Sequence, residues 1–136
     1  MKQVGRFDSP GTAFAVALDG GYAYLADGEG GLRVVDISDP SKPVEAGFYE
    51  TARAAVDVAV LGNLAYVAEE GNGVRVVNIT NPGEPVEVFF YDTPGTASRV
   101  AVTSRALYVA DEQGGLLIFR LPYALSNSIA LPLVIG

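Results

Sequence analysis

The run Leu32-Arg33-Val34-Val35-Asp36-Ile37 decides the fold, because near copies of it return at residues 74–79 and, more loosely, at residues 116–121. The copies read VRVVNI and LLIFRL, and each follows the previous one by 42 residues. Short runs rich in valine, isoleucine and leucine favour extended backbone. A proline turn follows the first two runs, and proline cannot donate to the centre of a β-ladder. Each run is therefore predicted to be one β-strand of a 42-residue repeat.

The same spacing extends upstream of these runs. Tyr24, Tyr66 and Tyr108 lie in the similar surroundings AYLAD, AYVAE and LYVAD. Glycine, proline, asparagine and aspartate separate short apolar runs throughout each unit, and no stretch has a helical period. In the first unit the predicted strands span residues 13–18, 22–26, 32–37 and 44–49. Four strands in a repeat of roughly 40 to 45 residues predict a β-propeller blade, so we expect an all-β chain with three blades.

The runs LRVVDI and VRVVNI, each followed by an Asp-Pro or Asn-Pro turn, resemble the LVIVD repeat family. The resemblance covers about residues 4–121 and implies a β-propeller, often in secreted or surface proteins, but it implies no activity. The third copy departs from the pattern, since Phe119-Arg120-Leu121-Pro122 replaces the Asp/Asn-Ile pair. Residues 1–10 lack the apolar run of a secretory signal, so the chain itself leaves its compartment undefined.

The opening residues match the outer strand of a blade. Residues 2–10 align at the repeat spacing with residues 44–52 and 86–94, which makes Phe7 the equivalent of Tyr49 and Tyr91. The third unit, in contrast, contains only three strand-like runs. The expected organisation of the single domain is an outer strand donated to a partner blade at 1–10, blade 1 at 11–50, blade 2 at 51–92, blade 3 without its own outer strand at 93–121, and a C-terminal tail at 122–136.

Three blades do not close a ring by themselves. Propellers have about 4 to 8 blades, and an open row would expose two apolar sheet faces. We therefore predict a homodimer in which two chains close a six-bladed β-propeller, with residues 1–10 of each chain added to the edge left by residues 115–121 of the other. The tail segment 128–135 is a competing occupant of that edge. Alternatively, the chain is a fragment of a larger secreted or surface propeller.

Composition narrows the function. The chain has no cysteine and no histidine, which excludes disulfides, thiolate nucleophiles, imidazole bases and Cys/His zinc sites. Its net charge of -7 opposes binding to nucleic acid and to anionic membranes. The apolar segment 129–135 is broken by Pro132 and is too short to insert as a spanning helix. We expect a non-enzymatic interaction or scaffolding module; a weak carboxylate-based hydrolase in the central channel is the catalytic alternative, because two carboxylates suffice for glycoside hydrolysis.

Acidic residues recur at one end of the predicted blades, where the turn between the second and third strands meets the crossover to the next blade. The turns contain Asp27, Glu29, Glu69, Glu70, Asp111 and Glu112, the crossovers contain Asp8, Glu50 and Asp92, and the nearby cations are Arg53 and Arg99. Such a face would attract a basic protein or a cationic ligand. Ca²⁺ is the weak metal candidate for the six turn carboxylates, and no other cofactor is expected. Once-per-unit recurrence favours a scaffold role for Asp27, Glu69 and Asp111, as acceptors for turn N–H groups.

One position of the innermost strand varies among the three units, which contain Ala15, Asp57 and Arg99 there. Positions that differ between repeats are free to serve a function. Our hypothesis is that Asp57 and Arg99 form an ion pair across neighbouring blades, as part of the interaction face near the channel. The alternative is that both side chains point into channel water, where a pair contributes only about 0 to 1 kcal/mol.

Overall fold

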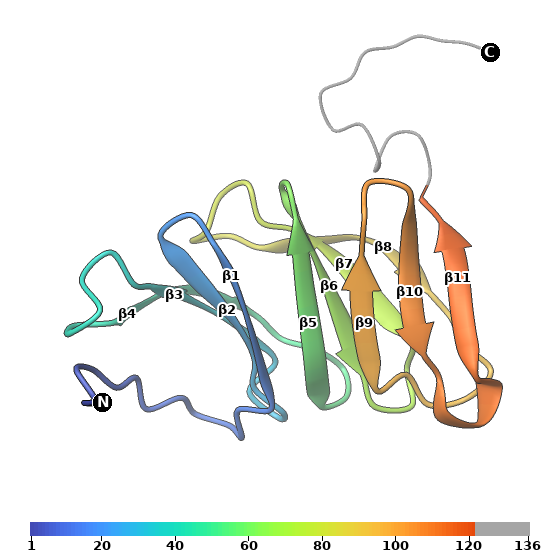
Figure 1. Ribbon diagram of the computed structural model, residues 1–136, viewed down its shortest axis with the longest axis horizontal. Coiled ribbons are helices and arrows are strands. Elements are labelled where there is room, and N and C mark those ends of the chain that lie inside the picture. The colour runs from blue at the N-terminus through green and yellow to red at the C-terminus, as the bar shows by residue number, and fades with distance from the viewer. Residues whose placement is uncertain (122–136) are drawn as a thin grey trace, which may run out of the picture.

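The computed structural model describes residues 1–121, in which eleven strands form three antiparallel sheets (Figure 1). Blade 1 contains β1 (Ala15–Asp19), β2 (Tyr22–Ala26), β3 (Leu32–Asp36) and β4 (Val44–Tyr49). Blade 2 contains β5 (Ala55–Leu61), β6 (Leu64–Glu69), β7 (Val74–Asn78) and β8 (Val86–Tyr91). Blade 3 contains β9 (Arg99–Val102), β10 (Ala106–Ala110), the 3-10 turn η1 (Glu112–Gly114) and β11 (Leu116–Arg120). The predicted strands of the first unit are present, although β1 begins at Ala15 rather than at residue 13.

Strands follow chain order within each sheet, and the repeat extends to small irregularities of the backbone. Between β3 and β4 the register shifts at Val34/Val35, and between β7 and β8 it shifts at Val76/Val77. Each shift is a β-bulge, which bends and twists the outer strand. Blades 1 and 2 therefore share this bulge, although blade 2 has a further register shift at Ala55/Asp57 between β5 and β6.

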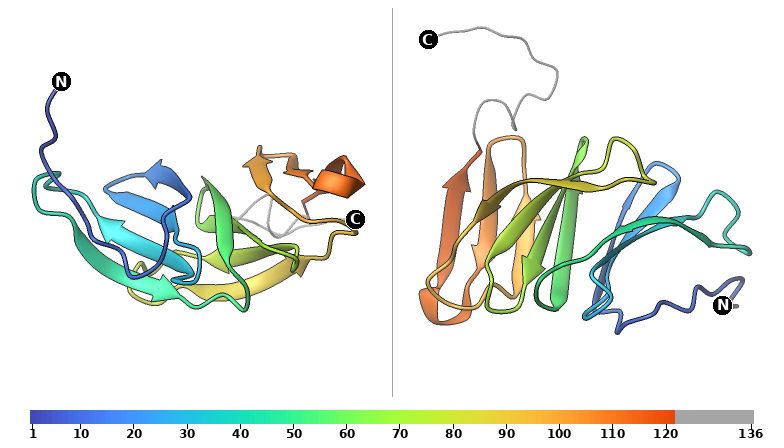
Figure 2. Two further views of the ribbon diagram at one scale, coloured as in Figure 1. Left: turned by 90° about the horizontal axis from the view of Figure 1, so that it is seen from below. Right: turned by 180° about the vertical axis from the view of Figure 1, so that it is seen from behind.

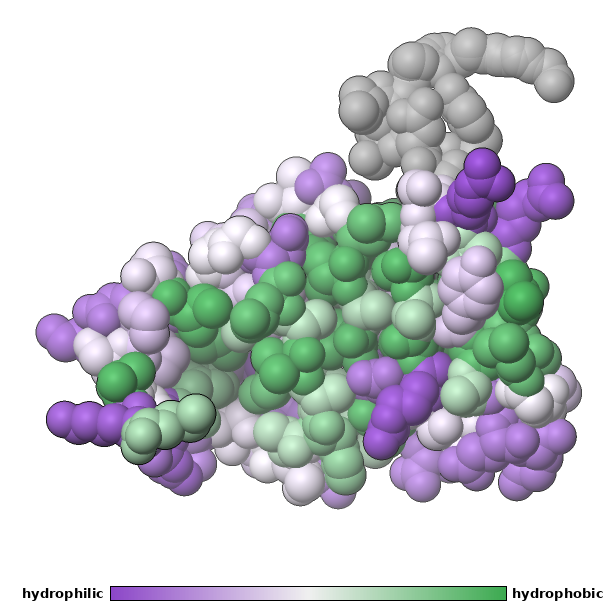
Figure 3. Space-filling view, in the orientation of Figure 1, coloured by the Kyte–Doolittle hydropathy of each residue, from purple (hydrophilic) through white to green (hydrophobic). Residues whose placement is uncertain are grey.

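The blades stand in a curved row with their inner strands side by side. Strand β5 lies between β1 and β9, while β4 and β8 lie on the convex side (Figure 2). Space-filling colours show that hydrophobic side chains gather in front of these inner strands (Figure 3). Among residues 1–121, no helix has the length and hydropathy to cross a membrane.

The core consists of two seams between neighbouring blades. In the first seam, Tyr24 and Val34 of blade 1 pack with Val58 and Val67 of blade 2. In the second seam, the members are Tyr66, Val74, Val76, Leu107 and Val109 from blades 2 and 3. No blade has a core of its own, so stability comes from blade-on-blade packing, as in other repeat proteins.

The same repeat positions are exposed where the row ends. Val74 and Val76 are 0% exposed in the second seam, whereas their equivalents Leu116 and Ile118 on β11 are 66% and 60% exposed. At the other end of the row Val16 is 58% exposed, although its equivalent Val58 is only 5% exposed. Each end of the row therefore exposes an apolar sheet face of the kind that is buried between blades elsewhere.

Residues 1–10 form no strand within the chain but lie against blade 1. A Cβ on Gly5 would lie 1.9 Å from the Pro40 carbonyl oxygen, and one on Gly47 would lie 2.2 Å from the Pro82 carbonyl oxygen. Gly47 and Pro82 are the repeat equivalents of Gly5 and Pro40. The opening segment therefore lies against blade 1 in the same way as β4 lies against blade 2. A groove of about 350 Å³ between the segment and the blade is lined by Phe7, Leu25 and their neighbours. The predicted tail at 122–136, including the competing edge segment 128–135, lies outside the described residues.

Candidate binding face at the crossover edge

Three buried carboxylates fasten the turns of this edge to the crossovers. The backbone N–H of Gly11 donates to Asp27 Oδ2 at 2.8 Å, and that of Gly95 donates to Asp111 Oδ2 at 2.7 Å. Ser9 Oγ adds a hydrogen bond to Asp27 Oδ1 at 2.5 Å. Both aspartates are 0% exposed. Both aspartates thus accept backbone hydrogen bonds as their recurrence predicted, but the donors lie in the crossovers and not in the turns as expected.

The second unit makes the same junction with longer side chains. Glu69 replaces aspartate, and its Oε1 accepts from the Arg53 backbone N–H at 3.2 Å and from Asn72 Nδ2 at 3.0 Å. Its Oε2 lies 3.6 Å from Arg75 Nε. In units 1 and 3 a glycine, Gly30 or Gly114, takes the place of Asn72. A longer acid and an amide thus fill the space that a shorter acid and a glycine occupy elsewhere.

The six turn carboxylates do not come together as a calcium site. Asp27, Glu69 and Asp111 are buried, whereas Glu29, Glu70 and Glu112 point outward. Within residues 1–121, no three acidic side chains approach one another closely enough to hold a metal ion. A Ca²⁺ site needs six to eight oxygen ligands around one point. The calcium hypothesis therefore has no converging ligand set in this part of the chain.

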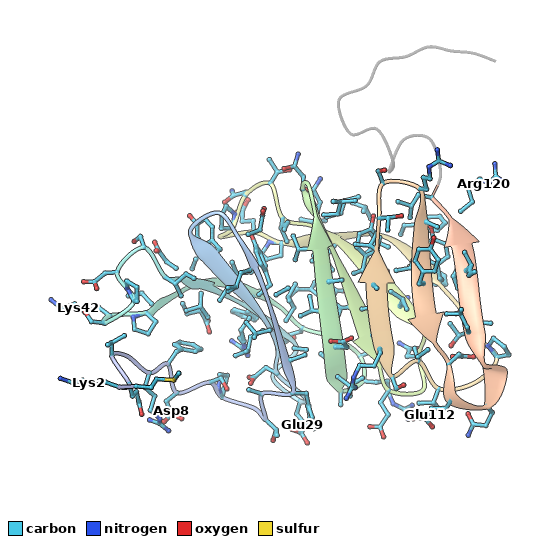
Figure 4. The ribbon with its side chains drawn as sticks, viewed as in Figure 1. Lys2, Asp8, Glu29, Lys42, Glu112 and Arg120 are labelled. Carbon is cyan, nitrogen blue, oxygen red and sulfur yellow. The ribbon has the colours of Figure 1, made fainter. Side chains whose placement is uncertain are left out.

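Six exposed carboxylates remain on the predicted face. They are Glu29, Glu70 and Glu112 in the turns and Asp8, Glu50 and Asp92 in the crossovers. Asp8, Glu29 and Glu112 lie along one edge of the molecule, while Arg120 lies on the opposite edge (Figure 4). Arg53 and Arg99 are also exposed. The nine carboxylates predicted for this face thus divide into three that hold its loops and six that face solvent.

Asp57 and Arg99 do not form the predicted ion pair. Asp57 Oδ2 instead accepts a hydrogen bond from the Val100 backbone N–H on β9 at 2.8 Å. Arg99 Nη1 donates to the carbonyl oxygen of Ser98, its chain neighbour, at 2.8 Å. Asp57 has the backbone partner because a backbone donor at the seam is fixed in place, whereas an exposed arginine would lose side-chain entropy on pairing. Asp57 thus joins blades 2 and 3 and is not part of the exposed face.

The LVIVD repeat family model matches residues 10–51, 52–93 and 94–119. This chain belongs to the LVIVD repeat family. A search of the solved structures found, among others, a chain described as the computationally designed Ika4 protein, with a TM-score of 0.65 and 9% sequence identity. The match covers 79% of this chain and 64% of that chain, so this chain spans less than two thirds of its length. That likeness shows the fold alone, and no curated protein matches.

The first two LVIVD repeats share a contact between their outer strands that the sequence analysis missed. Arg33 Nη1 lies 3.2 Å from Glu45 Oε2, and the Arg33 guanidinium stacks 4.4 Å above the Phe48 ring. In the second repeat Arg75 lies 3.5 Å from Glu87 Oε2 and 4.5 Å above the Phe90 ring. The recurrence of Arg, Glu and Phe at fixed spacing could have indicated this contact. The sequence does not show the register shift at the bulge, however, and so does not show which of these residues face each other.

A tyrosine links the outer strands of neighbouring repeats. The Tyr49 hydroxyl of β4 donates to Glu87 Oε1 of β8. Burial and this hydrogen bond raise the pKa of Tyr49 above its ordinary range. Its equivalent Tyr91 is buried, and within residues 1–121 its hydroxyl has no hydrogen-bond partner. Burial also raises the pKa of Tyr91.

Tyr66 predicts how stability depends on alkaline pH. Burial in the second seam raises the pKa of Tyr66 from 10.0 to about 12. The folded chain then holds this proton more tightly than the unfolded chain, so stability is undiminished below about pH 10 and falls as pH rises from about 10 to about 12. Thermal melts across this range, with 295 nm absorbance to follow tyrosinate, should show the loss. Tyr66→Phe should make the decline shallower, and the remaining decline is assigned to Tyr49 and Tyr91, whose pKa values are also raised. An equally steep decline in that variant would mean that Tyr66 does not contribute.

Proposed function

We propose that this LVIVD repeat protein is a non-catalytic interaction module that binds a basic partner through its crossover face. The observation that supports this function is the division of the nine carboxylates. Three are buried and fix the loops, while six exposed ones project from those loops beside Arg53 and Arg99. One of the six, Asp8, forms an ion pair with Arg6 at 3.4 Å. A fixed array of like charges raises the local concentration of oppositely charged partners and speeds their association.

The proposed assembly is a homodimer in which two chains close a six-bladed propeller. Its support is the pair of open seam faces, with Leu116 and Ile118 exposed at one end of the row and Val16 at the other. Two chains bring the blade number to six, within the usual range of about 4 to 8. Closure would place both crossover faces on one side of the ring and double the exposed carboxylates.

A lysine-rich peptide tests the binding function. Affinity is measured by fluorescence anisotropy at about 20 mM and about 150 mM salt, because the Debye length shortens to about 8 Å over this range. Glu29→Lys with Glu112→Lys should weaken binding about tenfold at low salt, since two reversals of charge cancel most of the negative charge along the edge. Affinity of the unaltered protein should also fall as salt rises.

The matched control reverses two carboxylates on the other edge, Asp19→Lys with Glu84→Lys. Both residues are exposed, and the two double variants change net charge equally. The control should retain most of the affinity. Equal losses in the two variants would mean that net charge alone attracts the peptide, and the proposed face would be rejected.

A further inference from the structure

The turn before β11 has the same backbone conformation as the corresponding turns in blades 1 and 2, which have a fourth strand. Gly31 and Gly73 have φ values of 74° each, and a Cβ on them would lie 2.4 Å and 2.1 Å from the carbonyl oxygens of Tyr49 and Tyr91 on the outer strands. Gly115 is their equivalent and has a φ of 77°, yet a Cβ there would meet nothing within 4 Å. The close approach of an outer strand explains why positions 31 and 73 are glycine. At Gly115 the same space beside the turn is empty, so an outer strand would fit there.

The buried Tyr91 hydroxyl also lacks the partner that an outer strand supplies. Tyr49 makes its hydrogen bond to Glu87, the second residue of the next outer strand. The corresponding strand of blade 3 is absent from residues 1–121, and the Tyr91 hydroxyl is unpaired there. The opening segment has Gln3 at the repeat position of Glu45 and Glu87. A glutamine side-chain oxygen accepts a hydrogen bond from a tyrosine hydroxyl.

The opening segment and β11 each have a neutral residue where the other repeats have a charged one. Arg33 and Arg75 pair with the outer-strand residues Glu45 and Glu87, but β11 has Leu117 at the arginine position. At the glutamate position the opening segment has a neutral glutamine. An arginine without a glutamate, or the reverse, would leave a half-buried charge unpaired. Removal of both charges is expected if the two segments belong to one blade.

The opening segment cannot join β11 of its own chain as folded. It lies beside blade 1 at one end of the row, while β11 is at the other end (Figure 2). The contact of Gly5 with Pro40, together with the bonds of Ser9 and Gly11 to Asp27, places it as the outer strand of a blade that precedes blade 1. In a closed pair of chains, that preceding blade is blade 3 of the second copy.

We propose that residues 2–8 of each chain form the fourth strand of blade 3 in a second copy, so that two blades of the ring are built from both chains. This inference rests on the proposed two-chain assembly and specifies how its seams close. The register of β7 with β8 places Arg6 of one copy opposite Leu117 of the other, and Gln3 opposite Phe119. Gln3 then accepts from Tyr91 of the other copy. Lys2 meets Arg120 at the end of the ladder, an unfavourable pair, so Lys2→Glu should tighten the dimer.

Engineered cysteines test the register directly, since the chain has no cysteine of its own. The variant Arg6→Cys with Leu117→Cys should oxidise to a covalent dimer on a non-reducing gel. Arg6→Cys with Ile118→Cys is the matched control, because a shift of one residue turns the second side chain to the other face of the sheet. Circular dichroism of the reduced variants checks that both are folded.

Sedimentation equilibrium separates this proposal from the assembly on which it rests. A mass of twice 14.2 kDa with the cross-link supports both. A dimer whose Arg6→Cys, Leu117→Cys variant does not cross-link would overturn the exchanged strand and leave the two-chain assembly. A folded monomer would overturn both, and deletion of residues 122–136 would then show whether the chain's own tail occupies the edge.

Two substitutions report on the composite blade without cysteines. Gly115→Ala should weaken dimerisation at least about tenfold by collision with the exchanged strand, while Gly62→Ala, also at positive φ with nothing within 4 Å, should not. Gln3→Leu and Tyr91→Phe should each weaken dimerisation about fivefold, and the double variant no more than either one, because they remove the same hydrogen bond. Additive losses would show that Gln3 and Tyr91 do not meet.

Discussion

Gly73→Ala should lower the melting temperature by about 10 °C or more, although it adds only one methyl group. The added Cβ would lie 2.1 Å from the Tyr91 carbonyl oxygen, at the point where β7 pairs with β8 through Val74 and Tyr91. The clash is with backbone, so β8 must move away from β7. An L-residue at φ 74° costs about 1 to 2 kcal/mol by itself, and displacement of a packed strand adds about 1 to 3 kcal/mol.

The control is Gly62→Ala in the β5–β6 hairpin. Its φ is 62°, so it has the same backbone penalty, but nothing lies within 4 Å of the added Cβ. Differential scanning calorimetry should show a loss of no more than about 5 °C for this variant. Gly31→Ala, whose Cβ would lie 2.4 Å from the Tyr49 carbonyl oxygen, should behave like Gly73→Ala. Similar losses at positions 62 and 73 would mean that φ alone requires glycine.

These glycines show why the blades could be predicted from sequence. Gly31, Gly73 and Gly115 recur with the strands because each repeat makes the same turn at the same place. Strand positions follow from alternation and turn residues, which are local features. The scaffold role of Asp27 could be predicted in the same way, since a residue needed by every blade recurs in every blade.

Contacts across seams could be predicted less well. Asp57 has no equivalent acid in the other units, and its partner is a backbone N–H on β9 that no pattern of side chains reveals. The contact of Arg33 with Glu45 and Phe48 depends on the register after a bulge, which shifts residues by one between faces. Recurrence indicates that a residue matters to the scaffold, but it does not say what that residue touches.

Positions at which one repeat differs from the other two tell most about specific contacts, because the common blade structure does not determine the residue there. Glu69 and Asn72 depart together and touch each other. Leu117 and Gln3 also depart together, and they belong to β11 and to the opening segment, which are far apart in the sequence. If compensating changes occur between residues in contact, the second pair would meet only between two chains, which is the contact that the proposed strand exchange supplies.

Glu69→Ala should cost about 3 to 5 kcal/mol of unfolding free energy, since it removes a buried charge and leaves its partners unpaired. Glu69 is 1% exposed, and it accepts from the Arg53 N–H and from Asn72 Nδ2 while facing Arg75. Alanine fills none of that space. The loss should be measured by urea unfolding, with an unchanged slope showing that the unfolded state is the same.

Two variants separate the effect of burial from the effects of charge and hydrogen bonding at Glu69. Glu70→Ala removes the adjacent exposed carboxylate and should change stability by no more than about 0.5 kcal/mol. Glu69→Gln keeps an oxygen acceptor for the Arg53 N–H but loses the charge opposite Arg75, so its cost should lie between those of the two alanine variants. A Glu69→Ala loss as small as that of Glu70→Ala would show that the crossovers are held by the strands alone. The loops that present the six exposed carboxylates would then lack the buried anchor on which a fixed binding face depends.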